Sequence, residues 1–264
     1  QNPFFARVAH DIDGALRGSS HNLIIASSEE AETQERELLD SLYALNLRGV
    51  IVAPAASEGS AHLHRLVAEG YPLVVIDRVV PGLGCDTVSV DNAGGAREAV
   101  AYLIAQGHRR IGVIHDDSRL ITAQERLAGY RSALLESGLP VDPTLMAVSQ
   151  STVQHAIDAT IRLFSRRERP TALFTLDSLM TTGALLALRS MGLRVPQDVS
   201  LVGFDDFDFA TFTDPQITVV SQPVGQIGAL AVQLLMERIA GHDGPPRQTR
   251  FPTKLIVRGS VTRA

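Results

Sequence analysis

The chain has 264 residues, of which 45% are hydrophobic and 5% aromatic with no Trp, and this suits one large α/β unit or two smaller lobes built on aliphatic side chains. Its formal net charge of -5 at pH 7 excludes a sequence-wide basic field that could hold a phosphate backbone, so we expect any nucleic-acid binding by a parent protein to lie outside this chain. The single cysteine, Cys85, excludes an intrachain disulfide, and no apolar run reaches the roughly 18 residues that span a bilayer.

Short apolar runs alternate with longer segments of helical period along the whole chain. Such alternation predicts an α/β fold, with parallel sheets whose strands are connected by helices. Glycines that can adopt a left-handed conformation follow several of the predicted helices, for example Gly70, Gly107 and Gly138. In chain order, we expect helix 5–17, strand 23–26, helix 30–45, strand 50–53, helix 61–69, strands 73–76 and 87–90, helix 92–106, strand 111–115, helices 124–137 and 153–164, strand 172–175, helix 179–191, strand 199–204 and helix 224–240.

Two places in this order bear on domain organisation. The chain opens on a turn-like Gln1-Asn2-Pro3 and a helix, whereas a doubly wound lobe normally begins with a strand, so we expect that the first strand precedes Gln1. Polarity rises at 116–120, between a strand and the next helix, which favours a crossing between two lobes there.

The predicted strand 199–204 leads directly into Asp205. A buried parallel strand shows an apolar run of this kind, and ligands of open α/β sheets lie beyond the carboxyl ends of the strands. Asp205 is therefore a candidate ligand-binding residue.

Motifs for catalysis are missing from the sequence. There is no Gly-x-Ser-x-Gly elbow and no Gly-Lys-Ser/Thr phosphate loop, and the pair Gly94-Gly95 lacks the spacing of a dinucleotide fingerprint. Asp91 and Asn92, just before that pair, are more typical of a helix N-cap. We therefore expect that the chain is not an enzyme and holds no cofactor.

Three local clusters of possible metal ligands lack the spacings that metals require. They are His62-x-His64, His115 to Asp117 and Asp205 to Asp208. A calcium loop needs a Gly at its sixth position and a Glu at its twelfth, whereas counting from Asp206 gives Thr211 and Ile217. We expect structural or surface roles for all three clusters and no bound metal.

Polar and aromatic residues gather instead at strand ends and in the loops that follow them. Aromatic faces, carboxylates, guanidinium groups and amides together are typical of sites for small polar ligands, because each ligand hydroxyl must keep its hydrogen bonds when it is desolvated. Taken singly, Asp77-Arg78 is more often a local ion pair than a ligand clamp, and Phe4 and Phe5 are more often core residues. The set comprises Asn2, Phe4, Phe5, Asp77, Arg78, Arg126, Asp205 and Gln222.

With these residues in view, the whole chain resembles the effector-binding core of the LacI/GalR family of bacterial transcription regulators, which shares the periplasmic sugar-binding-protein fold. Each motif is weak alone, but many occur in order across nearly all of the chain. The matching stretches are 2–5, 49–52, 75–78, 88–92, 107–112, 125–130 and 195–206, and 255–260 resembles the family's last strand.

The resemblance implies two doubly wound parallel-sheet lobes joined by three crossovers, a periplasmic binding protein-like fold of type I. The crossovers would fall near 116–120, 221–223 and 247–250, so that 1–116 with 224–247 form the N-terminal lobe and 117–223 with 248–264 the C-terminal lobe. It also implies a homodimer, and operator DNA bound through a helix-turn-helix domain that is missing from this chain. The parent protein would be cytoplasmic, with no membrane partner.

Residue by residue, the eight polar and aromatic positions match positions that contact effector or sugar in relatives. Leu176 is a ninth candidate ligand-binding position, at which the residue type departs from that of the relatives. Leu176 precedes Asp177 where relatives frequently carry an Asn-Asp pair, and Ala53 stands where sugar binders often carry Asn. Each lost amide removes hydrogen-bonding capacity worth about 1 kcal/mol or more if its partner is left unpaired. The effector is expected to be sugar-like but less hydroxylated than a hexose, or differently oriented.

The resulting hypothesis is an allosteric sensor in which a small polar ligand, a sugar or sugar derivative, binds between the lobes and controls operator binding. An alternative with the same fold is a periplasmic sugar-binding receptor of an ABC transporter, which would carry a signal peptide and no helix-turn-helix upstream of Gln1. An enzyme of the doubly wound class is the third possibility, and it lacks a nucleophile or cofactor motif.

Overall fold

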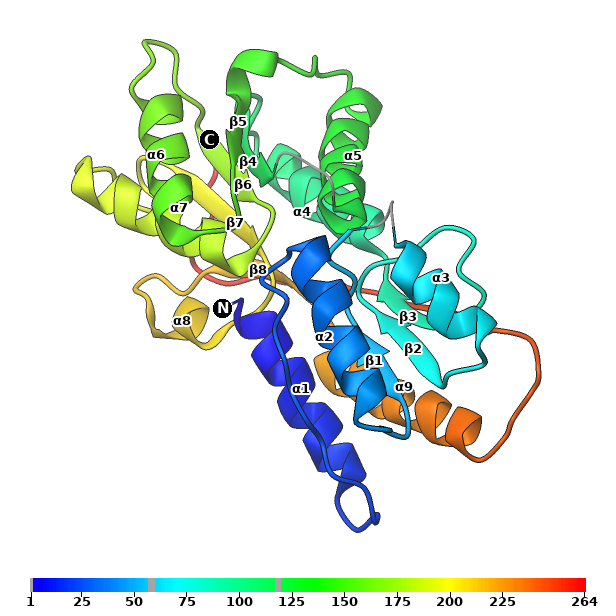
Figure 1. The fold of residues 1–264 in the computed structure, drawn as a ribbon. Helices are drawn as coiled ribbons and strands as arrows, with labels where there is room; N and C mark the ends of the chain where they lie inside the picture. Colours follow the sequence, from blue (N-terminus) through cyan, green and yellow to red (C-terminus); the bar gives the residue numbers. More distant parts are fainter. Residues whose placement is uncertain (1, 57–59, 117–119) are drawn as a thin grey trace.

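A computed structural model describes residues 2–56, 60–116 and 120–264, and it contains two β-sheets flanked by helices (Figure 1). One sheet has four strands in the order β1-β2-β3-β9, and the other has six in the order β10-β8-β7-β6-β4-β5. Every pairing is parallel except that of β10 with β8. The predicted α/β fold with two parallel-sheet lobes is confirmed.

The first lobe forms around the four-stranded sheet. Its strand β2 is buried on both faces, as an apolar run in a parallel sheet should be. Val74 and Ile76 pack with α1 and α9 on one face, while Leu73 and Val75 pack with α2 and α3 on the other. The elements are α1 (Pro3–Leu16), α2 (Glu32–Ala44), β1 (Val50–Val52), α3 (Ala61–Ala68), β2 (Leu73–Ile76), β3 (Asp86–Val90), α9 (Val224–Ile239) and β9 (Gln248–Phe251).

The second lobe forms around the six-stranded sheet, with helices α4 and α5 on one side of it and α6 and α7 on the other (Figure 1). Within each pair a glycine allows close contact: a Cβ at Gly129 would lie 2.3 Å from the Ala93 carbonyl oxygen, and a Cβ at Gly183 would lie 2.5 Å from that of Val153. The elements are α4 (Asn92–Ala105), β4 (Ile111–Asp116), α5 (Ile121–Glu136), a short 3-10 helix (Pro143–Leu145), β5 (Met146–Ser149), α6 (Val153–Phe164), β6 (Ala172–Thr175), α7 (Ser178–Ser190), β7 (Ser200–Phe204), α8 (Asp208–Phe212), β8 (Thr218–Ser221) and β10 (Lys254–Ile256).

Sheet membership corrects the expected lobe boundaries. The chain first changes sheets at Asp91, between β3 and α4, because β4 already pairs with β5 and β6 in the six-stranded sheet. The crossing expected at 116–120 is therefore wrong, and its residues 117–119 lie outside the described part. The third crossing lies at 252–253, after β9 has paired with β3, and not at 247–250. The second, between β8 and α9, falls where 221–223 was predicted.

The predicted strand 23–26 is not a strand in the structure. These residues pair with no strand of the described chain, and Ile24 and Ile25 are 57% and 69% exposed. An apolar run predicts a strand only if a neighbouring strand satisfies its backbone groups, and here β1 is the edge strand of its sheet. No described helix is long and apolar enough to cross a membrane.

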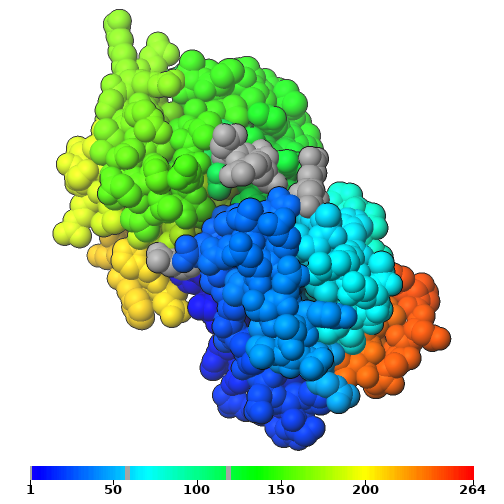
Figure 2. Space-filling model, in the orientation of Figure 1, coloured from blue at the N-terminus to red at the C-terminus, as the bar shows by residue number. Residues whose placement is uncertain are grey.

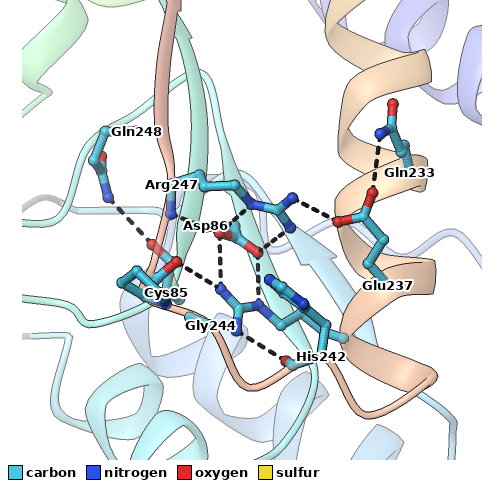
Figure 3. A network of polar contacts seen from close by, with 10 residues as sticks. Cys85, Asp86, Gln233, Glu237, His242, Gly244, Arg247 and Gln248 are labelled. Atoms are coloured by element: carbon cyan, nitrogen blue, oxygen red, sulfur yellow. Dashed lines mark hydrogen bonds and ion pairs between the residues drawn. The ribbon is translucent and has the colours of Figure 1, made fainter.

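A buried carboxylate, Asp86, ties three elements of the first lobe together (Figure 3). Asp86 begins β3 and is fully buried, and it accepts hydrogen bonds from Arg238 Nε of α9 at 2.7 Å and from the Arg247 backbone N–H at 2.7 Å. Arg247 also pairs with Glu237 at 2.5 Å. Burial by itself raises the pKa of Asp86, but the hydrogen bonds from the two arginines outweigh it and hold that pKa at about 2. This network anchors β9 and thereby the third crossing.

Candidate functional site

All nine residues predicted to bind ligand line one cavity between the lobes. The first lobe contributes residues from the start of α1 and the end of β2, and the second lobe contributes α5 and the ends of β6 and β7. Gln222 lies at the second crossing. Whether these residues bind ligand stays a prediction; the structure brings together Asn2, Phe4, Phe5, Asp77, Arg78, Arg126, Leu176, Asp205 and Gln222.

Asp77 and Asp205 occupy corresponding positions in the two lobes. Each follows the last residue of a buried strand, and each backbone N–H continues the ladder with a 2.9 Å bond, to Val88 and Val220 respectively. Both then adopt positive φ angles, 65° and 75°. A left-handed conformation costs a non-glycine residue on the order of 1 kcal/mol and tends to persist at functional sites. The two strained aspartates, one from each lobe, thus line the same cavity.

The carboxyl groups of Asp77 and Asp205 are buried. Burial raises the pKa of each, and the positive charge of Arg126 opposes this increase. The Asp205 charge in turn raises the pKa of Asp77, so the two carboxylates disfavour each other's ionised form. The cavity is therefore a place where hydrogen-bond donors from a ligand are favoured.

Arg126 projects from α5 into the cavity and is 7% exposed. Its Nε donates to Asn92 Oδ1 at 2.8 Å, and its Nη1 donates to the Leu176 carbonyl oxygen at 2.7 Å. Its guanidinium carbon lies 3.8 Å from the centre of the Phe204 ring, a cation–π contact. These contacts fix the guanidinium group in the cavity wall.

Gln222 has an unmet hydrogen-bonding group. Its Nε2 donates to Asp205 Oδ1 at 2.5 Å, but its Oε1 has no partner among the described residues, although the residue is only 7% exposed. A buried acceptor without a partner costs about 1–3 kcal/mol, so such groups in native proteins usually meet a ligand or a water molecule.

Arg78 is tied to the first lobe. Its Nη1 donates to the Pro54 carbonyl oxygen at 2.8 Å, its Nη2 pairs with Glu30, and its Nε lies 3.6 Å from Asp77 Oδ2. The guanidinium carbon is 5.7 Å from the Phe5 ring centre. The local ion pair that the sequence favoured for Asp77-Arg78 is present, and both residues also line the cavity.

Asn2 links the two lobes at the start of α1. Its Oδ1 accepts from the Phe4 backbone N–H at 3.0 Å as an N-cap, and also from Ser178 Oγ of α7 at 3.2 Å. Phe4 is a core residue of the first lobe that reaches the cavity, and Phe5 packs edge-on against it with ring centres 5.1 Å apart. These three residues thus combine structural roles with a place in the cavity wall.

Sequence reasoning missed about half of the lining. Asp177 could have been found, because an Asp between a strand and a helix is a typical N-cap: it accepts from the Met180 N–H at 2.6 Å and pairs with Ser151. Glu30 carried no signal, since only the fold brings it to Arg78. The missed residues are Glu30, Asp116, Leu120, Thr122, Ala123, Ser151, Asp177 and Met180.

Carboxylates outnumber cations in this cavity. Among the described lining residues, the carboxylates of Glu30, Asp77, Asp116, Asp177 and Asp205 stand against two arginines, 78 and 126. An anionic ligand would add to this negative charge, whereas a neutral ligand with hydroxyl or N–H groups could donate to carboxylate oxygens. No group of His, Cys, Asp and Glu that could hold a metal ion occurs among the described residues.

The cavity volume between the lobes is about 50 Å³. Small-molecule sites usually measure about 300–1,000 Å³, so a ligand needs movement of the lobes or of the lining side chains to enter. In the space-filling view the first lobe, in blue, cyan and orange, meets the green and yellow second lobe along a diagonal band (Figure 2). The arrangement can therefore couple ligand binding to the relative position of the lobes.

Comparisons with known proteins agree with this architecture. A family model described as a periplasmic binding protein-like domain matches residues 100–261. The HTH-type transcriptional repressor CytR of Escherichia coli (strain K12) is 31% identical over 263 residues, which cover 100% of this chain and 76% of the relative.

Solved structures of transcriptional regulators also resemble this chain in fold and sequence. The complex of transcriptional regulator CelR with cellobiose has a TM-score of 0.89 and 32% identity, covering 98% of this chain and 79% of that one. A probable LacI family transcriptional regulator from Corynebacterium glutamicum has a TM-score of 0.89 and 27% identity, and the match covers 100% of this chain and 96% of that one. The prediction that the chain is not an enzyme agrees with these relatives, which are named as transcriptional regulators.

Proposed function

Because the chain belongs to the LacI family of transcriptional regulators, as the effector-binding core, we propose that its effector is a small neutral hydroxylated molecule, a sugar or sugar derivative, bound between the lobes. The observation that carries the proposal is the pair of buried, left-handed aspartates, Asp77 and Asp205, one from each lobe, with Arg126 near both. Two carboxylates accept from ligand hydroxyls, while the guanidinium group donates to a ligand oxygen.

A neutral effector is favoured by the charge of the described cavity lining, because a phosphate or carboxylate group would meet its five carboxylates. The related regulator CelR was solved as a complex with cellobiose, which supports a carbohydrate class here. Leu176 supports a ligand with fewer hydroxyls than a hexose at one position, since its buried side chain offers no hydrogen bond and its backbone N–H and carbonyl already bond to Ile114 and Arg126. Ala53 is not among the cavity residues and instead packs against the core of the first lobe.

Control of DNA binding would follow from the position of the site. A ligand that contacts Asp77 in the first lobe and Arg126 in the second binds more tightly to one relative arrangement of the lobes than to another. Such differential affinity typically supplies 1–3 kcal/mol of coupling. In a homodimer whose helix-turn-helix domains precede this core, the shift in lobe arrangement would change operator affinity; the net charge of -5 leaves the DNA contacts to those domains.

The test is a thermal-shift screen of sugars, polyols, nucleosides and sugar phosphates, followed by calorimetry of the compounds that stabilise the protein. We expect neutral compounds to bind and their phosphorylated counterparts to fail. Asp77→Asn should weaken the best compound about ten-fold or more, because it replaces a charged acceptor with a neutral one. The matched control is Asp208→Asn, an exposed residue of α8. Equal affinities of the two variants, or tighter binding of a phosphorylated sugar, would refute the proposal.

A further inference from the structure

A chain of four polar side chains leads from the inter-lobe cavity to the third crossing. Arg126 in the cavity wall donates from Nε to Asn92 Oδ1 at 2.8 Å, and Asn92 Nδ2 donates to Glu125 Oε2 at 3.0 Å. The other carboxylate oxygen of Glu125 accepts from Arg250 Nη2. We call these four residues the arginine relay, because an arginine stands at each end.

The arginine relay joins the two lobes. Arg250 lies in β9, the edge strand of the four-stranded sheet, with Ser89 of β3 opposite it. Asn92 begins α4, and Glu125 and Arg126 are neighbours in α5, so these three residues belong to the second lobe. Arg250 is thus the member of the relay that moves with the first lobe.

The relay stands where the first and third crossings are bonded to each other. The Asp91 backbone N–H donates to the Phe251 carbonyl oxygen at 2.8 Å, and Thr253 Oγ1 donates to the Asp91 carbonyl oxygen at 3.4 Å. A change in the relative position of the lobes bends the chain at its crossings. Such a change therefore acts on the contact between Arg250 and Glu125.

The direction of every hydrogen bond in the relay is set by the chemistry of its members. A guanidinium group only donates, and an ionised carboxylate only accepts. The amide of Asn92 lies between the two kinds of group, so its oxygen has to face Arg126 and its nitrogen has to face Glu125. Asn92 is fully buried, and the loss of either partner would leave a buried polar group unsatisfied.

Glu125 is the link that Arg250 holds in place. The ion pair fixes one oxygen of the Glu125 carboxylate, so that the other oxygen faces Asn92. The side chain of Glu125 is 22% exposed and that of Arg250 is 48% exposed, so without the arginine this carboxylate can turn toward water. Asn92 would then lose its acceptor, and its hold on Arg126 would weaken.

We propose that Arg250 is a positioning residue for Arg126 and acts from the first lobe through Glu125 and Asn92. The inference deepens the proposed function and rests on it for its consequence. If Arg126 binds the effector, a lobe arrangement that keeps the Arg250 ion pair binds the effector more tightly than one that breaks it. Arg250, Glu125 and Asn92 are not among the described residues that line the cavity, so the effect of Arg250 on binding is indirect.

Hydrogen exchange of arginine side chains tests the relay without any ligand. In the full chain carrying isotope-labelled arginine, the Arg126 Nε–H signal is identified by its disappearance in Arg126→Lys. We expect this hydrogen to exchange about two- to five-fold faster in Arg250→Gln and in Glu125→Gln, because a partly exposed ion pair shifts an opening equilibrium by about that factor. Arg250→Lys keeps the positive charge and should restore most of the protection.

The matched control is Arg97→Gln. It removes the ion pair of Arg97 with Glu136, which joins the same two helices, α4 and α5, through half-exposed side chains 3.5 Å apart. Neither residue is among the described lining of the cavity, so the exchange of the Arg126 Nε–H should stay at its wild-type rate. Equal rates in Arg250→Gln and Arg97→Gln would overturn the proposal.

The Nε–H of Arg238 serves as an internal reference for stability. It donates to the buried Asp86 carboxylate in the first lobe, and the relay does not include it. A general loss of stability would speed the exchange of both hydrogens, whereas a loss of positioning should speed that of Arg126 alone. Parallel acceleration of Arg126 and Arg238 in Arg250→Gln would therefore also overturn the proposal.

Calorimetry with D-ribose, D-glucose and cellobiose as probes tests the consequence for binding. A probe that binds the wild type should bind Arg250→Gln about two- to five-fold more weakly, and Arg250→Gln should add no weakening in the Arg126→Lys background. Weakening by the same factor in both backgrounds would overturn the proposal, since Arg250 would then act by another route. Unchanged affinity in Arg126→Lys would contradict the proposed function instead, and the exchange rates would still decide on the relay.

Discussion

Replacing Asp205 with Asn should make the protein more stable and a poorer binder of its effector. Asn can keep the left-handed backbone conformation, which Asn and Asp tolerate better than other non-glycine residues. In the wild type Gln222 Nε2 donates to Asp205 Oδ1 at 2.5 Å, and the amide oxygen of the new Asn can accept the same hydrogen bond. The substitution therefore removes one buried negative charge with little change of shape.

The two effects have opposite signs for a physical reason. Burial raises the pKa of Asp205 despite the nearby Arg126, so the ionised form is less favourable in the folded protein than in the unfolded chain. Removing the charge should raise the free energy of unfolding at pH 7 by on the order of 1 kcal/mol. A hydrogen bond from a ligand hydroxyl to a carboxylate contributes about 1.5–3 kcal/mol, so its loss should weaken effector binding about ten-fold or more.

Urea unfolding at pH 7 and at pH 5, together with calorimetric titration of the effector, checks this prediction. A raised pKa means that the folded state takes up a proton before the unfolded state, so the Asp205 contribution to stability improves as the pH falls through the folded pKa. The stability advantage of Asp205→Asn over the wild type should therefore shrink at the lower pH. An Asp205→Asn variant that is less stable than the wild type at pH 7, or that binds effector equally well, would refute the reasoning.

Two further predictions concern the framework that positions the site. Asp86→Asn should lower the free energy of unfolding by about 3 kcal/mol at pH 7, since it leaves Arg238 and Arg247 without their buried partner. The folded pKa of Asp86 is about 2, below its ordinary value, so the stability that Asp86 supplies in the wild type should be lost as the pH falls from about 4 to 2. Acid titration followed by circular dichroism should show this loss of stability in the wild type and not in Asp86→Asn. Gly129→Ala should cost roughly 2 kcal/mol or more, because its Cβ would lie 2.3 Å from the Ala93 carbonyl oxygen and must push α5 away from α4. The control Gly14→Ala, with nothing within 4 Å, should instead be neutral or raise stability by up to about 1 kcal/mol in urea unfolding, and equal effects of the two would contradict the packing argument.

The positions of the site residues along the chain were predictable. Asp77 and Asp205 each follow an apolar run, and such a run predicts a buried strand whose carboxyl end is where ligands bind in parallel sheets. Asn2, Arg126 and Gln222 belong to a scattered polar set that is uninformative residue by residue, and the resemblance to a family of regulators matched them to positions that contact effector or sugar in relatives. The structure places all five in one cavity wall.

The bonds of these residues were not predictable. The partners of Arg126 are Asn92 and the Leu176 carbonyl, and Arg78 meets Glu30 although 48 positions separate them. Sequence patterns report the period of apolar residues over a few turns, and they carry no record of which distant side chain completes a hydrogen bond. The unpartnered Gln222 Oε1 belongs to the same class of feature.

The lobe boundaries show where local information ends. The apolar pattern predicts a strand at 111–115, but the sheet to which this strand belongs depends on β5 and β6, which lie 30 or more positions further along the chain. The same holds for 23–26, whose apolar residues favour a strand that no described neighbour pairs with. The sequence alone therefore determines the alternation of helices and strands and the carboxylates at strand ends, because these features depend on residues a few positions apart. Sheet membership, the crossings and the cavity walls came only from the tertiary structure, because their energies come from contacts between distant segments.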